Sequence, residues 1–167
     1  MANVTIRPAT PSDLPALGRL GALLMRTHYN FDQKRFLEPG ANADEGYAWF
    51  LGEQLKDEGN AVVLVAEPFD SAQGKPGEVV GYVYATLEPI SWKELRDACG
   101  FIHDVAVDER TRRHGLATAL IEAAMKWLSD RGAPRVVLGT AEQNEPAQRL
   151  FERLGFRRTM VEMTREL

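Results

Sequence analysis

The chain has 167 residues, a formal charge of −4, 44% hydrophobic residues and 26% charged residues. This composition is ordinary for one globular domain with a single core, so residues 1–167 are expected to form one domain. The acidic balance argues against nucleic-acid binding, which needs a basic excess, and the single cysteine excludes an internal disulfide. No apolar run approaches the roughly 18 residues of a membrane span, and the N-terminus lacks a signal-peptide pattern, which predicts a cytoplasmic protein that contacts no membrane.

The N-terminal half of the chain combines strand and helix patterns. Runs of β-branched and apolar residues mark the strands, and apolar residues at helical spacing after Ser12 mark the first helix. An aromatic and polar stretch over residues 27–40 has no clear period. The expected elements are a strand over 4–7, a helix from Ser12 to Leu24, a helix over about 44–56, and strands over 61–66 and 79–87 joined by a hairpin loop over 69–78.

The C-terminal half predicts strands that alternate with helices. A polar connector over residues 91–97, expected to be partly helical, leads into it. The strand, helix and strand between residues 101 and 139 should form a right-handed parallel crossover, and the whole chain should be a three-layer α/β domain. The expected elements are strands over 101–107, 135–139 and 156–164 and helices over 115–131 and 145–154.

The turn after the strand over 101–107 carries the first chemical signal, because it leads into a helix and is rich in arginine and glycine. Backbone N–H groups at a helix start have no intrahelical partner and lie at the positive end of the dipole, so such an end binds phosphate well. Gly115 allows close approach of a ligand, Ala117 adds little bulk, and Arg112 and Arg113 add charged donors. Taken alone, this short motif is equally well explained by a solvated surface turn.

Two neighbouring features favour a binding site at this turn. His103 and Asp104 stand in the middle of an apolar strand, which is unfavourable unless they face a cleft or a partner. A polar segment beginning at Thr140 follows the next parallel strand, and ligands of open α/β sheets bind at such strand ends. Three elements therefore converge on one place.

The segment over residues 102–156 resembles the Gcn5-related N-acetyltransferase (GNAT) family in two sequence blocks, which cover about a third of the chain. The family's phosphate motif, Gln/Arg-x-x-Gly-x-Gly/Ala, is matched by Arg112, Gly115 and Ala117. Its second block, Asn-x-x-Ala followed by Leu-Tyr-x-x-x-Gly-Phe, is matched by Asn144, Ala147, Leu150, Gly155 and Phe156.

This resemblance implies a three-layer αβα fold with a mixed, mostly antiparallel central sheet that is splayed between the fourth and fifth strands. It also implies that acetyl-CoA lies between those two strands and that no metal takes part. Backbone groups of Val105 and Val107 would pair with the pantetheine arm, and the amides from Arg113 to Thr118 would hold the pyrophosphate. The implied cofactor-binding residues are Val105, Ala106, Val107, Arg112, Arg113, His114, Gly115, Leu116, Ala117, Thr118, Asn144 and Phe151.

The implied activity is transfer of an acetyl group from acetyl-CoA to a primary amine, by direct attack in a ternary complex. The backbone N–H of Val105 would stabilise the developing oxyanion. His103 has an ordinary pKa suited to a base near neutrality, whereas Asp104 would orient the acceptor or act through water. Successive strand residues point to opposite faces, so only one of this pair is expected to face the acceptor unless a bulge intervenes.

Phe151 departs from the family pattern, in which many members have a tyrosine whose hydroxyl protonates the leaving sulfur. Solvent, the product amine or another hydroxyl must then supply this proton, and Tyr29, Tyr82 and Tyr84 are the candidates. The acceptor pocket is expected beside the aromatic stretch after the first helix, where aromatic rings with carboxylates suit a cation. The candidate substrate-binding residues are Tyr29, Phe31, Asp32, Tyr82 and Tyr84.

Two other functions stay open from the sequence. The first is a catalytically weak or inactive module that binds acyl-CoA, which Phe151 makes more plausible. The second, another kind of nucleotide-binding protein, is disfavoured because no Gly-x-Gly-x-x-Gly or Gly-x-x-x-x-Gly-Lys-Ser/Thr occurs. The expected partner is a small-molecule or peptide amine, and the resemblance favours a homodimer, with the strand over 156–164 available for pairing.

Overall fold

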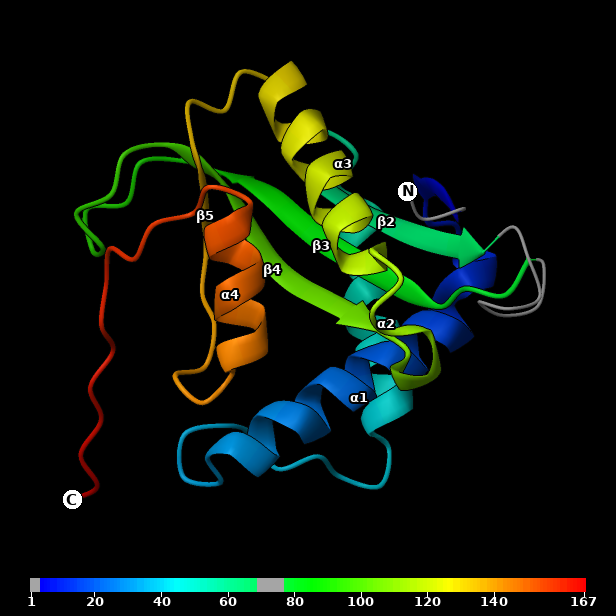
Figure 1. Cartoon of the computed structure of the whole chain (residues 1–167), viewed down its shortest axis with the longest axis horizontal. Helices are drawn as coiled ribbons and strands as arrows, with labels where there is room; N and C mark the ends of the chain where they lie inside the picture. The colour runs from blue at the N-terminus through cyan, green and yellow to red at the C-terminus, as the bar shows by residue number, and fades with distance from the viewer. Residues whose placement is uncertain (1–3, 69–76) are drawn as a thin grey trace.

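In the part of the chain that the structure describes, residues 4–68 and 77–167, five strands form one sheet whose spatial order follows the chain (Figure 1). The structure is a computed structural model. The strands are β1 (Val4–Pro8), β2 (Ala61–Pro68), β3 (Gly81–Glu88), β4 (Cys99–Val107) and β5 (Val136–Leu138). Neighbours are antiparallel from β1 to β4, and β4 is parallel to β5, which confirms the predicted fold class and the parallel connection.

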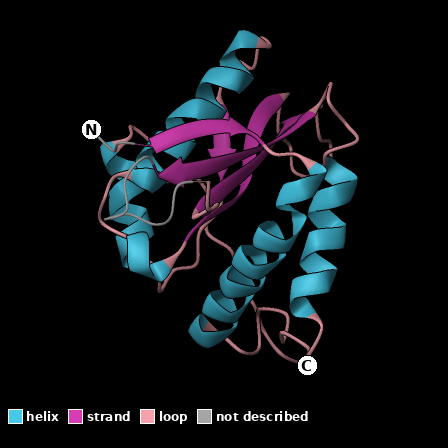
Figure 2. Ribbon diagram, turned by 90° about the vertical axis from the view of Figure 1, so that its right-hand side faces the viewer, coloured by secondary structure: helices cyan, strands magenta, loops and turns pink. Residues whose placement is uncertain are grey.

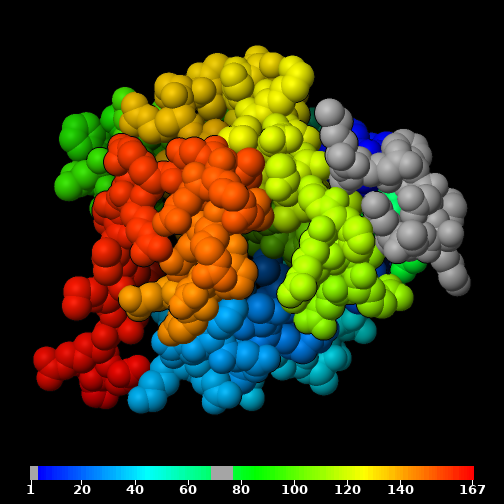
Figure 3. Space-filling view, viewed as in Figure 1, coloured from blue at the N-terminus to red at the C-terminus, as the bar shows by residue number. Residues whose placement is uncertain are grey.

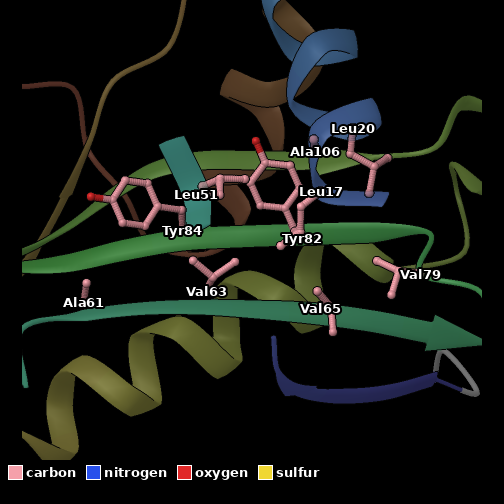
Figure 4. Packing of buried hydrophobic residues seen from close by; sticks show 10 residues of the cluster. All are labelled: Leu17, Leu20, Leu51, Ala61, Val63, Val65, Val79, Tyr82, Tyr84 and Ala106. Atoms are coloured by element: carbon pink, nitrogen blue, oxygen red, sulfur yellow. The ribbon is translucent and has the colours of Figure 1, made fainter. Parts of the chain in front are cut away.

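Helices cover both faces of the sheet and complete the three layers (Figure 2). The helices α1 (Leu14–Phe31) and α2 (Ala43–Gln54) pack on one face, while α3 (Leu116–Asp130) and α4 (Glu145–Arg153) pack on the other. Alternate residues of β2 enter the two cores: Val63 and Val65 lie in the core under α1 and α2 (Figure 4), whereas Val62 and Leu64 lie under α3. Burial of β2 on both faces explains why residues 61–66 are apolar without alternation.

Two glycines allow α1 and α2 to pack closely. A Cβ at Gly18 would lie 2.3 Å from the backbone oxygen of Asp44, and a Cβ at Gly21 would lie 2.0 Å from Cδ1 of Tyr47. A larger residue at Gly18 would displace the backbone of α2, and one at Gly21 would displace the ring of Tyr47, because real Cβ atoms do not approach other atoms so closely. The glycines of α1 therefore serve helix packing, and they bring Tyr47 toward β4.

The pairing of β4 changes at His103 on both of its edges. On the β3 side, Tyr84 pairs with Asp104 and Ala85 pairs with Ile102, so His103 is the extra residue of a β-bulge. On the other side, β5 pairs with β4 only as far as Ile102, which lies opposite Leu138. The sheet is therefore splayed between β4 and β5 from His103 onward, as the resemblance implies.

Two predicted elements do not form. Residues 156–164 follow α4 without strand structure, and Met160, Val161 and Met163 are exposed. A strand needs a neighbouring edge for its backbone groups, and β5 offers an edge of only three residues. The connector over 91–97 holds an isolated antiparallel bridge between Ser91 and Arg96 in place of a helical turn.

The other differences concern element ends. The helix α1 continues to Phe31, beyond the predicted end, so the first part of the unpatterned stretch is helical. Residues 69–76 of the predicted hairpin loop lie outside the described residues. No helix within 4–68 and 77–167 is both long and apolar enough to cross a membrane.

Candidate functional site

The splay leaves one edge of β4 open, and the backbone of β4 turns donors toward it. The N–H of Asp108 donates to the carbonyl of Val80, on the β3 side. Because N–H groups alternate between the two edges along a strand, those of Val107 and Val105 point to the open edge. The two residues expected to pair with the pantetheine arm thus present their donors where β5 no longer lies.

The bulge places His103 and Asp104 on the same face of the sheet. The ring of His103 stacks on that of Tyr84, with centroids 4.9 Å apart, and Asp104 accepts a hydrogen bond from Tyr82. Both tyrosines belong to the core under α1 and α2. The alternation that would have separated the His-Asp pair is therefore removed by the extra residue.

Asp104 joins three elements through one carboxylate oxygen. Its Oδ2 accepts hydrogen bonds from the hydroxyls of Tyr47 in α2 and Tyr82 in β3, each at 3.0 Å. Burial raises the pKa of Asp104, and the two phenol donors oppose that rise by stabilising the charged form. Burial and the nearby carboxylate raise the pKa of both tyrosines, so their hydroxyls stay protonated donors at neutral pH.

His103 is held between two aromatic rings and faces a hydroxyl and a carboxylate. It stacks on Phe101 at 4.6 Å as well as on Tyr84, and about a third of its side chain is exposed. Its Nε2 lies 2.8 Å from Oγ1 of Thr86 and 3.4 Å from Oε1 of Glu88. Burial lowers the pKa of His103, while the carboxylate of Glu88 opposes this change, so a neutral imidazole is available near neutral pH.

The start of α3 has the geometry of an anion site. Gly115 is the N-cap residue and has φ = 77°, a conformation that favours glycine, and as a glycine it has no side chain to cap the first turn. Arg113 also has a positive φ, of 70°, so the turn is held in an unusual backbone shape. The N–H groups of Leu116, Ala117 and Thr118 open this helix without an intrahelical acceptor. In Figure 3 the surface is hollowed between α4, the segment before α3 and α1.

Exposure distinguishes the residues of this turn. The side chains of Arg112, Arg113 and His114 are exposed, whereas that of Leu116 is buried in the core. Arg112 is paired with Glu109 at 3.5 Å, and Nδ1 of His114 contacts the carbonyl of Thr111. Leu116 can therefore meet a ligand only through its backbone.

Asp108 anchors the segment that leads into the turn. Its buried carboxylate accepts hydrogen bonds from Arg19 of α1, at 3.0 Å, and from the backbone N–H and the guanidinium of Arg110. These donors lower the pKa of Asp108 to about 2. The hydroxyl and the N–H of Thr111 donate to the carbonyl of Asp108. The turn before α3 is thereby fixed to α1.

The α4 side of the splay contains Asn144 and Phe151. The side-chain oxygen of Asn144 accepts from the N–H of Ala147 and caps α4, which leaves its amide nitrogen for another acceptor. Phe151 is half-buried, packs on the α3 side of the sheet and meets Phe156 edge to face at 6.0 Å. No hydroxyl stands at the position of Phe151.

The candidate acceptor residues fall into two groups. Tyr29 and Phe31 lie half-buried at the end of α1, and the carboxylate of Asp32 accepts from the N–H groups of Lys34 and Arg35 just beyond it. Tyr82 and Tyr84 lie in β3 instead, where Tyr82 is fully buried. The hydroxyl of Tyr84 donates to Gln54, and burial raises its pKa to about 12. The structure thus brings Tyr82 and Tyr84 to the His-Asp pair, and it places Tyr29, Phe31 and Asp32 at the C-terminal end of α1.

Several residues around this site were not predicted. Thr86, Glu88 and Asp108 contact or anchor predicted site residues. A signal existed for two of them, because Thr86 and Glu88 continue the alternation of Tyr82 and Tyr84 on one face of β3. Among the described residues no group of three or more His, Cys, Asp or Glu side chains could hold a metal ion.

Comparison with known proteins agrees with this geometry. Residues 23–156 match the model of the acetyltransferase (GNAT) family. The mycothiol acetyltransferase of Thermomonospora curvata is 33% identical over 167 residues, covering 94% of this chain and 52% of that protein. The N-alpha-acetyltransferase of Sulfurisphaera tokodaii is 36% identical over 121 residues, covering 68% of this chain and 66% of that protein. An aminoglycoside N-acetyltransferase in complex with CoA shares the fold, with a TM-score of 0.72, 17% identity and coverage of 100% of this chain and 96% of that chain.

The family match includes the splayed strands, the glycine turn and α4. This chain spans about half the length of the mycothiol acetyltransferase and about two thirds of the archaeal N-alpha-acetyltransferase. The matched region covers most of the chain, which confirms the resemblance found in the sequence. The chain belongs to the GNAT family of acetyltransferases.

Proposed function

We propose that this chain transfers an acetyl group from acetyl-CoA to a primary amine. The observation that carries the proposal is the coincidence at His103 of the β-bulge and the start of the splay. At this one position the open backbone edge of β4 meets a neutral histidine and a buried carboxylate. Family membership supports the same reaction, and acetyl-CoA would supply the activated acetyl thioester.

The residues present fit a CoA pyrophosphate. The first turn of α3 offers N–H groups with no side-chain cap, Gly115 adds no side chain, and Arg112 and Arg113 are exposed beside it. Positively polarised N–H groups and guanidinium groups together bind a diphosphate well. The N–H groups of Val105 and Val107 would align the extended arm along β4, in place of the missing strand partner.

His103 and Asp104 would have different roles: His103 would accept a proton, and Asp104 would act through its position and charge. His103 would accept a proton from the amine as it attacks, because its imidazole is neutral and partly exposed. Asp104 would hold β4 against α2, because its Oδ2 accepts hydrogen bonds from Tyr47 of α2 and Tyr82 of β3. Its negative charge would stabilise the positive charge that develops on the attacking amine. The N–H of Val105 would donate to the oxyanion that forms on the attacked carbonyl.

Direct attack fits the groups available better than an acyl-enzyme. Cys99 lies buried at the start of β4, four residues before His103, and Arg96 contacts its Sγ at 2.7 Å. Burial raises the pKa of Cys99, which disfavours the thiolate that a nucleophile needs. We therefore expect both substrates to be bound before transfer, which gives intersecting lines in initial-velocity plots.

The proton for the departing thiolate needs a source other than residue 151. The hydroxyls of Tyr82 and Tyr84 donate to Asp104 and Gln54, so neither is directed to a ligand in this structure. Solvent or the proton held by His103 would then reach the sulfur. This route needs no hydroxyl at Phe151, whose ring would pack against the CoA arm.

The names of the relatives indicate two broad classes of amine acceptor for this chain. One is named a mycothiol acetyltransferase and the other an N-alpha-acetyltransferase, so small-molecule amines and the α-amino groups of polypeptides are the two classes to test. A single-domain homodimer in the cytoplasm stays the prediction made from the sequence. Size-exclusion chromatography with light scattering measures the oligomeric state directly.

The deciding experiment has two arms. Calorimetric titration with CoA measures the cofactor site, with ATP as the control nucleotide. Release of CoA from acetyl-CoA is then followed against a panel of small primary amines and of peptides with free N-termini. Tight CoA binding with transfer to a panel member is the expected result, whereas CoA binding without transfer to any amine would favour the inactive acyl-CoA-binding module.

A further inference from the structure

Thr86 lies between His103 and Glu88 and contacts both. Its Oγ1 is 2.8 Å from Nε2 of His103 and 2.6 Å from Oε1 of Glu88. Thr86 and Glu88 are alternate residues of β3, and His103 is the bulged residue of the paired strand β4. The three polar groups therefore form a short chain across the two strands, at the position where the splay begins.

The hydrogen atoms in this chain can be counted. A threonine hydroxyl has one proton, and the short contact to the carboxylate of Glu88 uses it, because an ionised carboxylate only accepts. The oxygen of Thr86 must then accept from His103, so Nε2 of His103 carries a hydrogen. The second neighbour of Nε2, Oε1 of Glu88 at 3.4 Å, is also an acceptor and favours the same assignment.

We propose that Thr86 and Glu88 are positioning residues that hold neutral His103 as its Nε2–H tautomer and thereby make Nδ1 the atom that accepts the proton from the amine. This inference rests on the proposed function for the role of Nδ1. The tautomer itself is a property of the free protein.

The aromatic rings on either side support this arrangement. Tyr84 and Phe101 stack on the two faces of the imidazole at interplanar angles of 24° and 21°. Such stacking resists rotation of the imidazole out of its plane. Because Nε2 contacts Thr86, Nδ1 is the ring nitrogen that points away from Thr86. Nδ1 of His103 has no hydrogen-bond partner among the residues that the structure describes.

The proton movement balances without another reagent. The attacking amine loses one N–H proton to Nδ1 as its nitrogen bonds to the acetyl carbon and the carbon–sulfur bond breaks. His103 becomes an imidazolium, keeps its Nε2–H on Thr86, and gains stabilisation from the negative charge of Glu88. The proton then leaves Nδ1 for solvent or for the CoA thiolate.

The other two histidines provide an internal reference for the test. Nδ1 of His28 faces the carbonyl of Leu24 at 2.9 Å, and Nδ1 of His114 faces the carbonyl of Thr111 at 3.2 Å. A carbonyl only accepts, so both of these rings carry their hydrogen on Nδ1 when they are neutral. His103 should therefore be the exception among the three histidines of the chain.

Nitrogen-15 NMR of the histidine-labelled protein, without ligands and above the histidine pKa values, tests the tautomer. The signal of His103 is assigned by its loss in His103→Gln. We expect the Nε2–H pattern for His103 in the unaltered protein and in Thr86→Ser, and a mixed pattern in the double variant Thr86→Val/Glu88→Leu, which removes both acceptors of Nε2. An Nδ1–H pattern in the unaltered protein, or no change in the double variant, would overturn the proposal whether or not the chain acetylates amines.

Kinetics test the consequence for transfer. Thr86→Val should lower kcat about tenfold or more with little change in the KM for acetyl-CoA, and Thr86→Ser should recover most of the loss. Glu88→Gln keeps an acceptor for Thr86 but removes the charge, so it should lower kcat and move the acid limb of the pH profile to lower pH. The carboxylates that act on His103 are Glu88 of β3 and Asp104 of β4, and Asp104→Asn should move the limb in the same direction.

A merely structural role for Thr86 and Glu88 would lower stability and leave the pH profile in place. Unaltered pH profiles and kcat in Glu88→Gln and Thr86→Val would overturn the role of Nδ1. If the unaltered chain transfers to no amine, the proposed function fails, and the NMR result still decides the positioning claim.

Discussion

The ring of Tyr47 rests on the backbone of α1 at Gly21, where a methyl group would lie 2.0 Å from its Cδ1 atom. The other end of the same ring donates from its hydroxyl to Asp104 in β4, over 3.0 Å. One aromatic side chain therefore links the packing of α1 and α2 to the strand that carries the His-Asp pair.

This contact predicts opposite effects for two glycine-to-alanine changes. Alanine normally stabilises a helix by about 0.5–1 kcal/mol relative to glycine. Gly46→Ala in α2 should follow that rule, because nothing lies within 4 Å of a Cβ there. Gly21→Ala should destabilise the protein by about 1–3 kcal/mol, since the ring of Tyr47 must move. Urea unfolding measures both, and a stabilising Gly21→Ala would contradict the observed packing.

Asp104 should matter for turnover more than for CoA affinity. Asp104→Asn removes a charge that two phenol donors stabilise, and it changes no atom of the α3 turn. We expect kcat to fall at least about tenfold while the Kd for CoA changes less than about threefold. Tyr47→Phe and Tyr82→Phe each remove one hydrogen bond to Asp104 and keep its carboxylate, so they separate the effect of the charge on kcat from the effect of the hydrogen bonds.

Tyr47→Phe also has a predicted pH dependence. The pKa of Asp104 is raised in the folded protein, so its effect on stability is most favourable when it is protonated and declines as the pH rises through the folded pKa. Loss of a phenol donor raises that pKa further. Tyr47→Phe should therefore destabilise the protein more at pH 8 than at pH 4, and a larger loss at pH 4 would contradict this account.

The two segments proposed to hold the cofactor could be recognised in the sequence because the residues of each are contiguous. The turn around Gly115 and the block around Asn144 each match a family motif within a few residues, and their contact with CoA stays a prediction. The surroundings of His103 and Asp104 depend on tertiary contacts instead. Tyr47 meets Asp104 across 57 residues, and Thr86 meets His103 across 17.

The bulge decides which face each residue of β4 presents, and alternation alone cannot reveal it. Without the extra residue at His103, the pair His103-Asp104 would point to opposite faces. The predicted strand over 156–164 failed for a related reason, because β-rich composition forms a strand only where a partner edge exists. Pairing partners are a property of the whole sheet, which a local pattern does not contain.

Gly115 and Gly132, at opposite ends of α3, provide a matched pair for the cofactor turn. Both have a left-handed backbone, with φ of 77° and 82°, so alanine at either position introduces a similar strain of about 1–2 kcal/mol. Only Gly115 lies at the end of α3 whose N–H groups are open. Gly115→Ala should weaken CoA binding about tenfold or more, and Gly132→Ala should leave it unchanged, as measured by calorimetric titration. Equal affinities in the two variants would place the pyrophosphate elsewhere.

The buried carboxylate of Asp108 predicts how the fold responds to acid. Its pKa is lowered to about 2 by hydrogen bonds from Arg110 and Arg19, whereas the ordinary value is 3.8. A lowered folded pKa means that the stabilisation is present above pH 4 and is lost as the pH falls toward 2. Asp108→Asn should therefore lower the free energy of unfolding by about 2 kcal/mol at pH 6 and by much less near pH 2.5.

Asp130→Asn, which alters an exposed pair with Lys126, should change the free energy of unfolding little at either pH. Urea unfolding at the two pH values compares the variants. A loss from Asp108→Asn that is the same at both pH values would show that the charge of Asp108 does not stabilise the anchor between α1 and the cofactor turn.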